Sequence, residues 1–162
     1  MNQEVLKVKQ SKVSEIAESI KKSKSLVIVE YRGLTVAELT ELRRALRADN
    51  AMMGIYKNSL FKRAIDELGH SDINPLLCGP NAYVFSEDII VGPKAVRKFA
   101  KKNEKLIIKG GLIEGKFADA EQIKVVATLP GREGLISMFL SVLNAPIRNF
   151  ACAVKAVAEK AN

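Results

Sequence analysis

Apolar residues recur at every third and fourth position along the last part of the chain, from residue 134 onward. The steps between them alternate between four and three, which is the heptad pattern of a helix with one apolar stripe. The stripe comprises Ile136, Leu140, Leu143, Ile147, Phe150, Val154, Val157 and Ala161. Pro146 lies inside this pattern, so we expect a kink or break near Asn144 and Ala145. The pattern predicts a long C-terminal helix whose apolar side needs a partner.

Before this stretch, short apolar runs alternate with amphipathic segments of helical length. The first helix is predicted over residues 3–22, where Val13, Ile16 and Ile20 share one face. Strands are predicted at residues 26–29, 52–56 and 82–86, with two short strands at 106–108 and 112–113 about a Gly110-Gly111 turn. Further helices are predicted after Thr35, after Asn58, from Pro93 and after Asp119. This alternation indicates an α/β or α+β domain of two layers.

Local signals set several of the predicted boundaries. Thr35 with Glu38, and Asp119 with Gln122, fit capping boxes, and Asn58 is expected to cap the helix that follows it. Pro130-Gly131 separates the alternating part from the heptad stretch. We therefore expect a domain over residues 1–130 and a C-terminal helix over residues 131–162. Within that helix, a stem ends at about residue 145 and an arm begins at residue 147.

The charge distribution favours a nucleic-acid partner. The net charge of +8 and the pI near 9.5 point to an anionic partner, with nucleic acid first and an anionic membrane second. Lys and Arg outnumber Asp and Glu by 13 to 9 in residues 1–70, by 9 to 7 in residues 71–130 and by 4 to 2 in residues 131–162. The largest excess therefore lies away from the apolar stripe, whereas a membrane-surface helix carries its cations beside the stripe.

Several enzyme and metal signatures are incomplete. Residues 110–116 match most of a phosphate-binding P-loop, but Phe117 stands where a Ser or Thr hydroxyl would hold Mg²⁺. His70 is the only histidine, and Cys78 and Cys152 stand far apart, which excludes an ordinary structural zinc site and a disulfide framework. The chain begins without an apolar leader, and the uncharged run in its C-terminal stretch is too short to span a membrane. We expect a cytoplasmic protein with no catalysis, metal or cofactor.

Two strand-to-helix connections combine a cation with a helix N-terminus. Tyr31–Thr35 places Arg32 and a flexible Gly33 ahead of one helix, and Lys57–Arg63 opens the next. Free backbone N–H groups at a helix start, with a cation alongside, suit a phosphate. Both connections follow strands, so we expect them at one end of the sheet. There they favour RNA or DNA binding that is led by the phosphate backbone.

Two other basic clusters remain open to two interpretations. Lys7, Lys9 and Lys12 lie in the first half of the first helix, where positive charge is unfavourable beside the helix dipole. They are either phosphate contacts or a solvated face. The basic helix at residues 94–105 is either a second contact surface for nucleic acid or a solvated face.

Five short motifs occur in order along the whole chain: Tyr31-Arg-Gly-Leu-Thr35, Glu41-Leu-Arg43, Lys57-Asn-Ser59, Ala127-Thr-Leu-Pro130 and Asn144-Ala-Pro-Ile-Arg-Asn149. Together they resemble the bacterial large-subunit ribosomal protein ten family, whose members form the base of the ribosomal stalk. The resemblance implies an α+β fold, a two-layer ferredoxin-like sandwich domain followed by a long C-terminal helix. It implies that the domain binds large-subunit rRNA beside ribosomal protein eleven. It also implies that the helix carries dimers of the acidic stalk protein, which recruits translational GTPases, and that the two proteins together can repress their own mRNA.

The resemblance assigns roles to two sets of residues. The rRNA positions are Lys7, Lys9, Arg32, Gly33, Lys57, Asn58, Ser59 and Arg63. The stalk-protein face comprises Ile147, Phe150, Ala151, Val154, Val157 and Ala158. Longer family members have a further segment after the proline, which this chain lacks, so we expect two stalk dimers. The resemblance implies no membrane and no small-molecule substrate, and it places the protein in the large ribosomal subunit.

Two other classes of function are alternatives. The apolar stripe would also suit self-association, which would make the chain a homodimeric coiled-coil nucleic-acid-binding module. The e and g positions lack the complementary Glu/Lys pairs that usually support such pairing. The second alternative is a P-loop enzyme.

Overall fold

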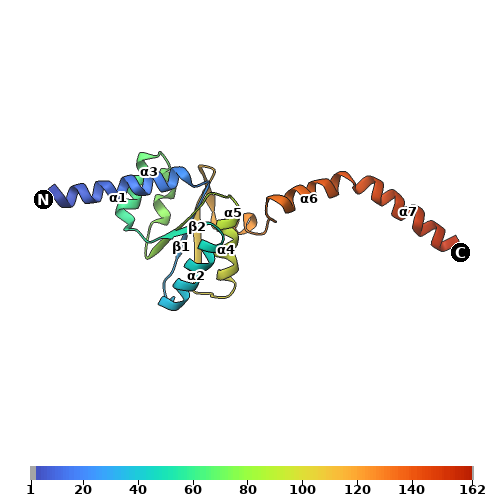
Figure 1. The fold of residues 1–162 in the computed structure, drawn as a ribbon, viewed down its shortest axis with the longest axis horizontal. Coiled ribbons are helices and arrows are strands. Elements are labelled where there is room, and N and C mark those ends of the chain that lie inside the picture. The colour runs from blue at the N-terminus through green and yellow to red at the C-terminus, as the bar shows by residue number, and fades with distance from the viewer. Residues whose placement is uncertain (1–2, 162) are drawn as a thin grey trace. The chain divides into compact units, whose positions relative to one another are not determined.

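The computed structural model describes the backbone of residues 3–161 and the side chains of residues 7–131 and 133–158. The chain divides into two compact units, which cover residues 1–128 and 129–162 (Figure 1). The first unit contains, in order, α1 (Gln3–Lys22), β1 (Ser25–Glu30), α2 (Val36–Ala48), β2 (Ala51–Gly54), α3 (Asn58–Glu67), the 3-10 helix η1 (Ser71–Leu76), β3 (Asn81–Ser86), α4 (Val91–Ala100), β4 (Ile107–Ile113), β5 (Lys116–Asp119) and α5 (Ala120–Val126). The second unit contains α6 (Arg132–Leu143) and α7 (Ala145–Ala161).

Five strands form one sheet in the order β2-β3-β1-β4-β5, and every neighbouring pair is antiparallel. The strands β1 to β4 and the helices α2 and α4 follow the sequence βαββαβ. Both of these helices pack on the same face of the sheet. This is the ferredoxin-like arrangement, and the predicted α+β class is confirmed.

Helices cover both faces of the sheet, which gives three layers where two were expected. Along β1, Val27 and Val29 join one core with α2, α4 and α5, whereas Leu26 and Ile28 join a second core with α1, α3 and η1. The sequence of β1 contains the reason, because a strand that faces water on one side alternates apolar and polar residues. The unbroken run over residues 26–29 therefore requires cover on both faces.

The glycine pair in residues 110–116 lies inside a strand, so the prediction of two short strands about a turn is wrong. β4 runs continuously from Ile107 to Ile113, and its pairing with β1 shifts register between Ile28 and Val29. A Cβ atom on Gly111 would overlap the carbonyl oxygen of Leu26, so glycine is required by the close approach of two backbones. The P-loop match is therefore a β-hairpin, and its residues do not cradle a phosphate ahead of a helix.

The predicted starts and ends of helices and strands are confirmed at some positions and wrong at others. Both capping boxes are present, Thr35 with Glu38 and Asp119 with Gln122, because each depends on residues only three positions apart. The basic helix α4 begins at Val91, two residues before Pro93. The strand β2 is shorter than predicted and ends at Gly54.

The second unit consists of two helices, α6 and α7, that meet at Asn144 and are inclined by 54°. The break falls where Pro146 predicted it, because proline lacks the N–H group that would continue the helical hydrogen bonds. Several large apolar side chains of α6 lie outside the heptad stripe and are exposed: Leu135, Met138, Phe139 and Val142. Among the described residues, no single helix is long and apolar enough to cross a membrane. By length and composition, α6 and α7 would be so only when taken together as a bent pair.

Candidate functional site

The two strand-to-helix connections lie at the same edge of the sheet. β1 and β2 are both antiparallel to β3, so they run in one direction and end together. The register places Glu30, the last residue of β1, opposite Asn81, and Gly54, the last residue of β2, opposite Tyr83. The expectation that these connections share one end of the sheet is confirmed.

A groove of about 450 Å³ lies between α1 and α3. Three cations line it: Lys9 from α1, Lys57 directly before α3 and Arg63 within α3. Ser59 adds a hydroxyl group. Among the side chains that the structure describes, Glu67 is the one acidic residue in the lining. Four of the positions that the sequence assigns to rRNA binding therefore meet in one groove, where positive charges exceed negative charges.

The cations of this groove are accessible. Lys9, Lys57 and Arg63 are all exposed. The two salt bridges among the described side chains, Lys22–Glu18 and Lys109–Glu30, lie outside the groove. The three charges are therefore not neutralised by a described carboxylate within 4.0 Å, so a phosphate would meet them unpaired.

The N-termini of α2 and α3 differ in their suitability for an anion. At α2, the Glu38 carboxylate accepts hydrogen bonds from the Thr35 backbone N–H at 2.6 Å and from the Thr35 hydroxyl group at 2.8 Å. Both hydrogen bonds lower the pKa of Glu38. A resident negative charge thus occupies that helix start. At α3, Lys57 is the N-cap without a side-chain cap, and the first turn has no acidic residue. The helix start at α3 is therefore the open one.

Arg32 and Gly33 do not lie in the groove. They belong to the connection ahead of α2, where both are exposed and Gly33 has a φ of +86°, a conformation that favours glycine. The Lys105 side chain lies beside Gly33, within 3.7 Å of where a Cβ would be. Glu38 accepts the Thr35 N–H at this helix start, so a carboxylate already lies where Arg32 was expected to accompany a phosphate. Lys7 is exposed on α1, outside the lining of the groove.

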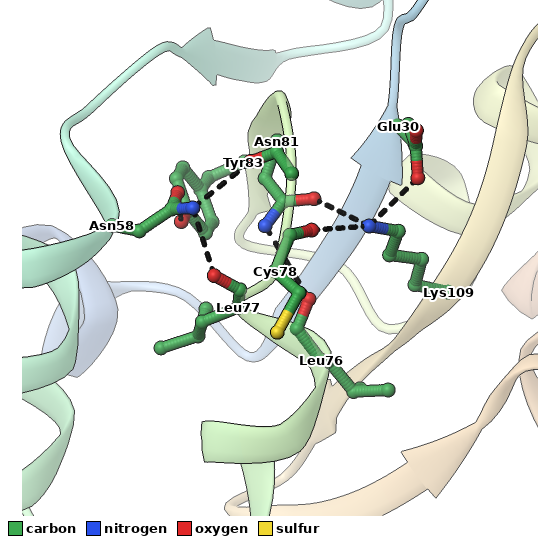
Figure 2. A network of polar contacts seen from close by, with 9 residues as sticks. Glu30, Asn58, Leu76, Leu77, Cys78, Asn81, Tyr83 and Lys109 are labelled. Carbon is green, nitrogen blue, oxygen red and sulfur yellow. Dashed lines mark hydrogen bonds and ion pairs between the residues drawn. The ribbon is translucent and has the colours of Figure 1, made fainter.

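Asn58 has a different role from the predicted helix cap. It is the first residue of α3, and Figure 2 shows its side chain directed toward the segment before β3. Its Nδ2 donates to the carbonyl oxygens of Leu77 and Gly79 at 2.8 and 2.9 Å, and its Oδ1 accepts the Tyr83 hydroxyl at 3.0 Å. Because both amide protons are used inside the protein, the Asn58 side chain has none left for an rRNA phosphate.

The segment Leu76–Pro80, which we call the 76–80 turn, has a hydrogen bond at every carbonyl oxygen. Asn81 Nδ2 binds Leu76, and Asn58 binds Leu77 and Gly79. Lys109 Nζ binds Cys78, and the Tyr31 backbone N–H binds Pro80. The turn is therefore tied to the connections that precede both α2 and α3.

Lys109 is a structural residue that the sequence reasoning missed. Figure 2 shows its ammonium group among three acceptors: the Cys78 carbonyl, Asn81 Oδ1 at 3.0 Å and the Glu30 carboxylate at 2.7 Å. The side chains of Lys109 and Glu30 are only 18% and 19% exposed. The available signal was a single lysine in an otherwise apolar and glycine-containing strand.

The apolar side of α7 is exposed along its length. Ile147, Phe150, Val154 and Val157 are 73%, 73%, 54% and 69% exposed. Their spacing of three and four residues places them on one side of the helix. Ala151 and Ala158, which are also exposed, lie on the same side and leave room for a partner's side chains. This arrangement suits docking against another apolar helix surface.

The described part of the chain offers no group of three His, Cys, Asp or Glu residues that could hold a metal ion. The chemistry of the site is thus that of cations, hydroxyl groups and exposed apolar surface. Such groups can bind phosphates and helices.

Comparisons with known proteins agree with this chemistry. Residues 4–101 match the family described as Ribosomal protein L10, and residues 129–162 match the Ribosomal protein uL10 C-terminal region. The Large ribosomal subunit protein uL10 of Bacillus cereus (strain B4264) is 51% identical over 157 residues, which cover 96% of this chain and 95% of the relative. The protein of the same name from Bacillus anthracis (strain A0248) has the same identity and coverage. These relatives are structural proteins rather than enzymes, and the chain belongs to the ribosomal protein L10 family.

Proposed function

We propose that this chain is a structural protein of the large ribosomal subunit in the cytoplasm, where it binds rRNA and forms the base of the ribosomal stalk. Its membership of the ribosomal protein L10 family supports the ribosomal role. The observation that carries the rRNA role is the groove between α1 and α3. That groove combines three accessible cations with an uncapped helix start.

In this proposal, the groove binds the phosphate backbone of the rRNA. Lys9, Lys57 and Arg63 supply the charge, and the Ser59 hydroxyl with the free N–H groups of the first turn of α3 supplies directed hydrogen bonds. Lys7 extends the basic surface along α1. Arg32 adds a cation at the same end of the sheet, and Lys105, whose side chain lies beside Gly33, adds another.

The second unit is proposed to dock the acidic stalk protein. The exposed apolar residues of α7 offer a surface without strong charge, which suits apolar docking of helices from small dimers. We propose two such dimers, which would recruit translational GTPases. Ribosomal protein eleven is the proposed neighbour on the rRNA, and repression of the protein's own mRNA would use the same rRNA-binding surface.

Co-purification from bacterial cells tests this proposal. The tagged full-length chain should sediment with the large ribosomal subunit and carry a small acidic protein. A variant that lacks residues 135–162 should retain the rRNA and lose the acidic protein, because both apolar cores lie in the first unit. Loss of rRNA binding in that variant would contradict the division of roles, and self-association without an acidic partner in sedimentation would favour the homodimeric coiled-coil module.

A further inference from the structure

The 76–80 turn lies between the two connections that are proposed to face rRNA. We propose that this turn fixes the spacing of those connections, and that Asn58 and Lys109 act as positioning residues for rRNA binding without contacting the rRNA. The inference rests on the proposed function, since it concerns how the same surface is held. It gives a role to the hydrogen bonds that Asn58 and Lys109 make to the 76–80 turn, although neither residue is proposed to touch the rRNA.

Asn58 ties the turn to the groove. Its side chain reaches from the first turn of α3, next to Lys57 and Ser59, to the carbonyl oxygens of Leu77 and Gly79. The Tyr83 hydroxyl holds the amide from its other end at 3.0 Å, and the Tyr83 ring is fully buried. The start of α3 is therefore anchored to the turn and to the core together.

Lys109 ties the turn to the other connection. Its ammonium group has three N–H bonds and meets three acceptors, which come from the turn, from β3 and from the end of β1. The acceptor at the end of β1 is Glu30, which directly precedes Tyr31, and the backbone N–H of Tyr31 binds the carbonyl oxygen of Pro80. The two residues before Arg32 are therefore both held: Glu30 by Lys109, and Tyr31 by the carbonyl oxygen of Pro80.

Glycine at position 79 makes this geometry possible. Gly79 has a φ of +79°, which a side chain would strain, and a Cβ there would lie 3.7 Å from Lys109 Nζ and 3.8 Å from Glu30 Oε1. The backbone at Gly79 thus passes close to the Lys109 ammonium group, which binds the carbonyl oxygen of the preceding residue, Cys78. A network built in this way sets where the connections lie before any ligand arrives.

Preorganisation raises affinity because less conformational freedom is lost on binding. The salt dependence of binding can therefore distinguish a positioning residue from a contact residue. Loss of a phosphate contact makes the salt dependence of binding shallower, whereas loss of preorganisation lowers affinity and leaves the number of phosphate contacts unchanged.

The test measures binding of the full-length chain to transcribed large-subunit rRNA over a range of salt concentrations. The positioning variants are Asn58→Ala and Lys109→Met, and the contact variant is Lys57→Gln. Ile123→Val controls for a loss of stability in a distant core position, and Lys116→Met controls for the loss of one positive charge. Amide hydrogen exchange over residues 76–80 reports on the turn in each variant.

Both positioning variants should bind rRNA about fivefold or more weakly than the wild type, with an unchanged salt slope and faster exchange in the turn. Lys57→Gln should reduce the slope by about 0.7 to 0.9, and the two controls should bind as the wild type does. Affinity equal to that of the controls, or a reduced slope in the positioning variants, would overturn the inference. If both variants fail to fold, Tyr83→Phe, which removes one hydroxyl, should weaken binding about twofold, and unchanged binding would overturn it. Absence of rRNA binding by the wild type would instead refute the proposed function.

Discussion

The Tyr83 hydroxyl donates a hydrogen bond to Asn58 Oδ1 at 3.0 Å inside the core between the sheet and α3. Phe61 stacks on the Tyr83 ring with 3.6 Å between the ring centroids. Burial raises the pKa of Tyr83 to about 12. The Tyr83 side chain therefore packs in the core and also holds Asn58, the first residue of the helix that lines the groove.

Stability at high pH should depend on Tyr83. The unfolded chain loses this proton near pH 10, whereas the folded protein keeps it to about pH 12, so the contribution is complete below pH 10 and is lost as the pH rises to 12. The expected loss is roughly 3 kcal/mol in the free energy of unfolding. In urea titrations from pH 9 to 12, Tyr83→Phe should show a shallower decline than the wild type. Parallel declines would contradict the burial of an un-ionised phenol.

The ion pair between Lys109 and Glu30 should contribute to stability. Lys109→Met should lower the free energy of unfolding by about 2 kcal/mol, because a largely buried carboxylate and two oxygen acceptors lose their donor. Glu30→Gln should cost less, since the amide oxygen still accepts a hydrogen bond. A double-mutant cycle should give a coupling of about 1 kcal/mol, and additivity of the two single changes would argue against direct contact.

Gly111 should be intolerant of a side chain. Gly111→Ala should lower the free energy of unfolding by more than about 2 kcal/mol, because the new methyl group would overlap the Leu26 carbonyl in the pairing of β1 with β4. Gly131→Ala is the control, since nothing lies within 4 Å of its Cβ position. Thermal unfolding of the full-length chain measures both variants, and equal midpoints would refute the close approach of these strands.

Docking on α7 should require its apolar side. Phe150→Asp combined with Val154→Asp should release the acidic stalk protein and leave rRNA binding intact, because burying two carboxylates in an apolar interface is costly. Asn149→Asp with Cys152→Asp adds the same charge on the opposite side of the helix and should retain the partner. Pull-down with the purified stalk protein decides, and unchanged binding in the first double variant would disprove the assigned face.

Features that depend on nearby residues were predictable from the sequence. The capping box at Thr35 and Glu38 and the break ahead of Pro146 each involve a few neighbouring positions, and both are present. The cations of α1 and α3 were identified individually. That Lys9 and Arg63 share a groove depends on how two helices pack, which no local pattern encodes.

Features that depend on distant partners were missed or misread. Gly110-Gly111 resembles a turn until the neighbouring strand at Leu26 is present. Asn58 resembles a cap, but its partners lie about 20 residues away in the 76–80 turn, and Lys109 satisfies a carboxylate at residue 30. Hydrogen bonds of this kind are specified by the tertiary fold rather than by local propensity.

The salt dependence of rRNA binding shows whether the groove between α1 and α3 holds the rRNA backbone. A triple variant, Lys9→Gln, Lys57→Gln and Arg63→Gln, removes the cations of the groove, and Lys94→Gln, Lys98→Gln and Lys101→Gln remove three exposed cations of α4 and its end. The groove variant should bind large-subunit rRNA much more weakly, with a log–log salt slope shallower by about 2 to 3. The α4 variant should keep the slope of the wild type. An unchanged slope in the groove variant, or an equal reduction in both, would contradict rRNA binding by this groove.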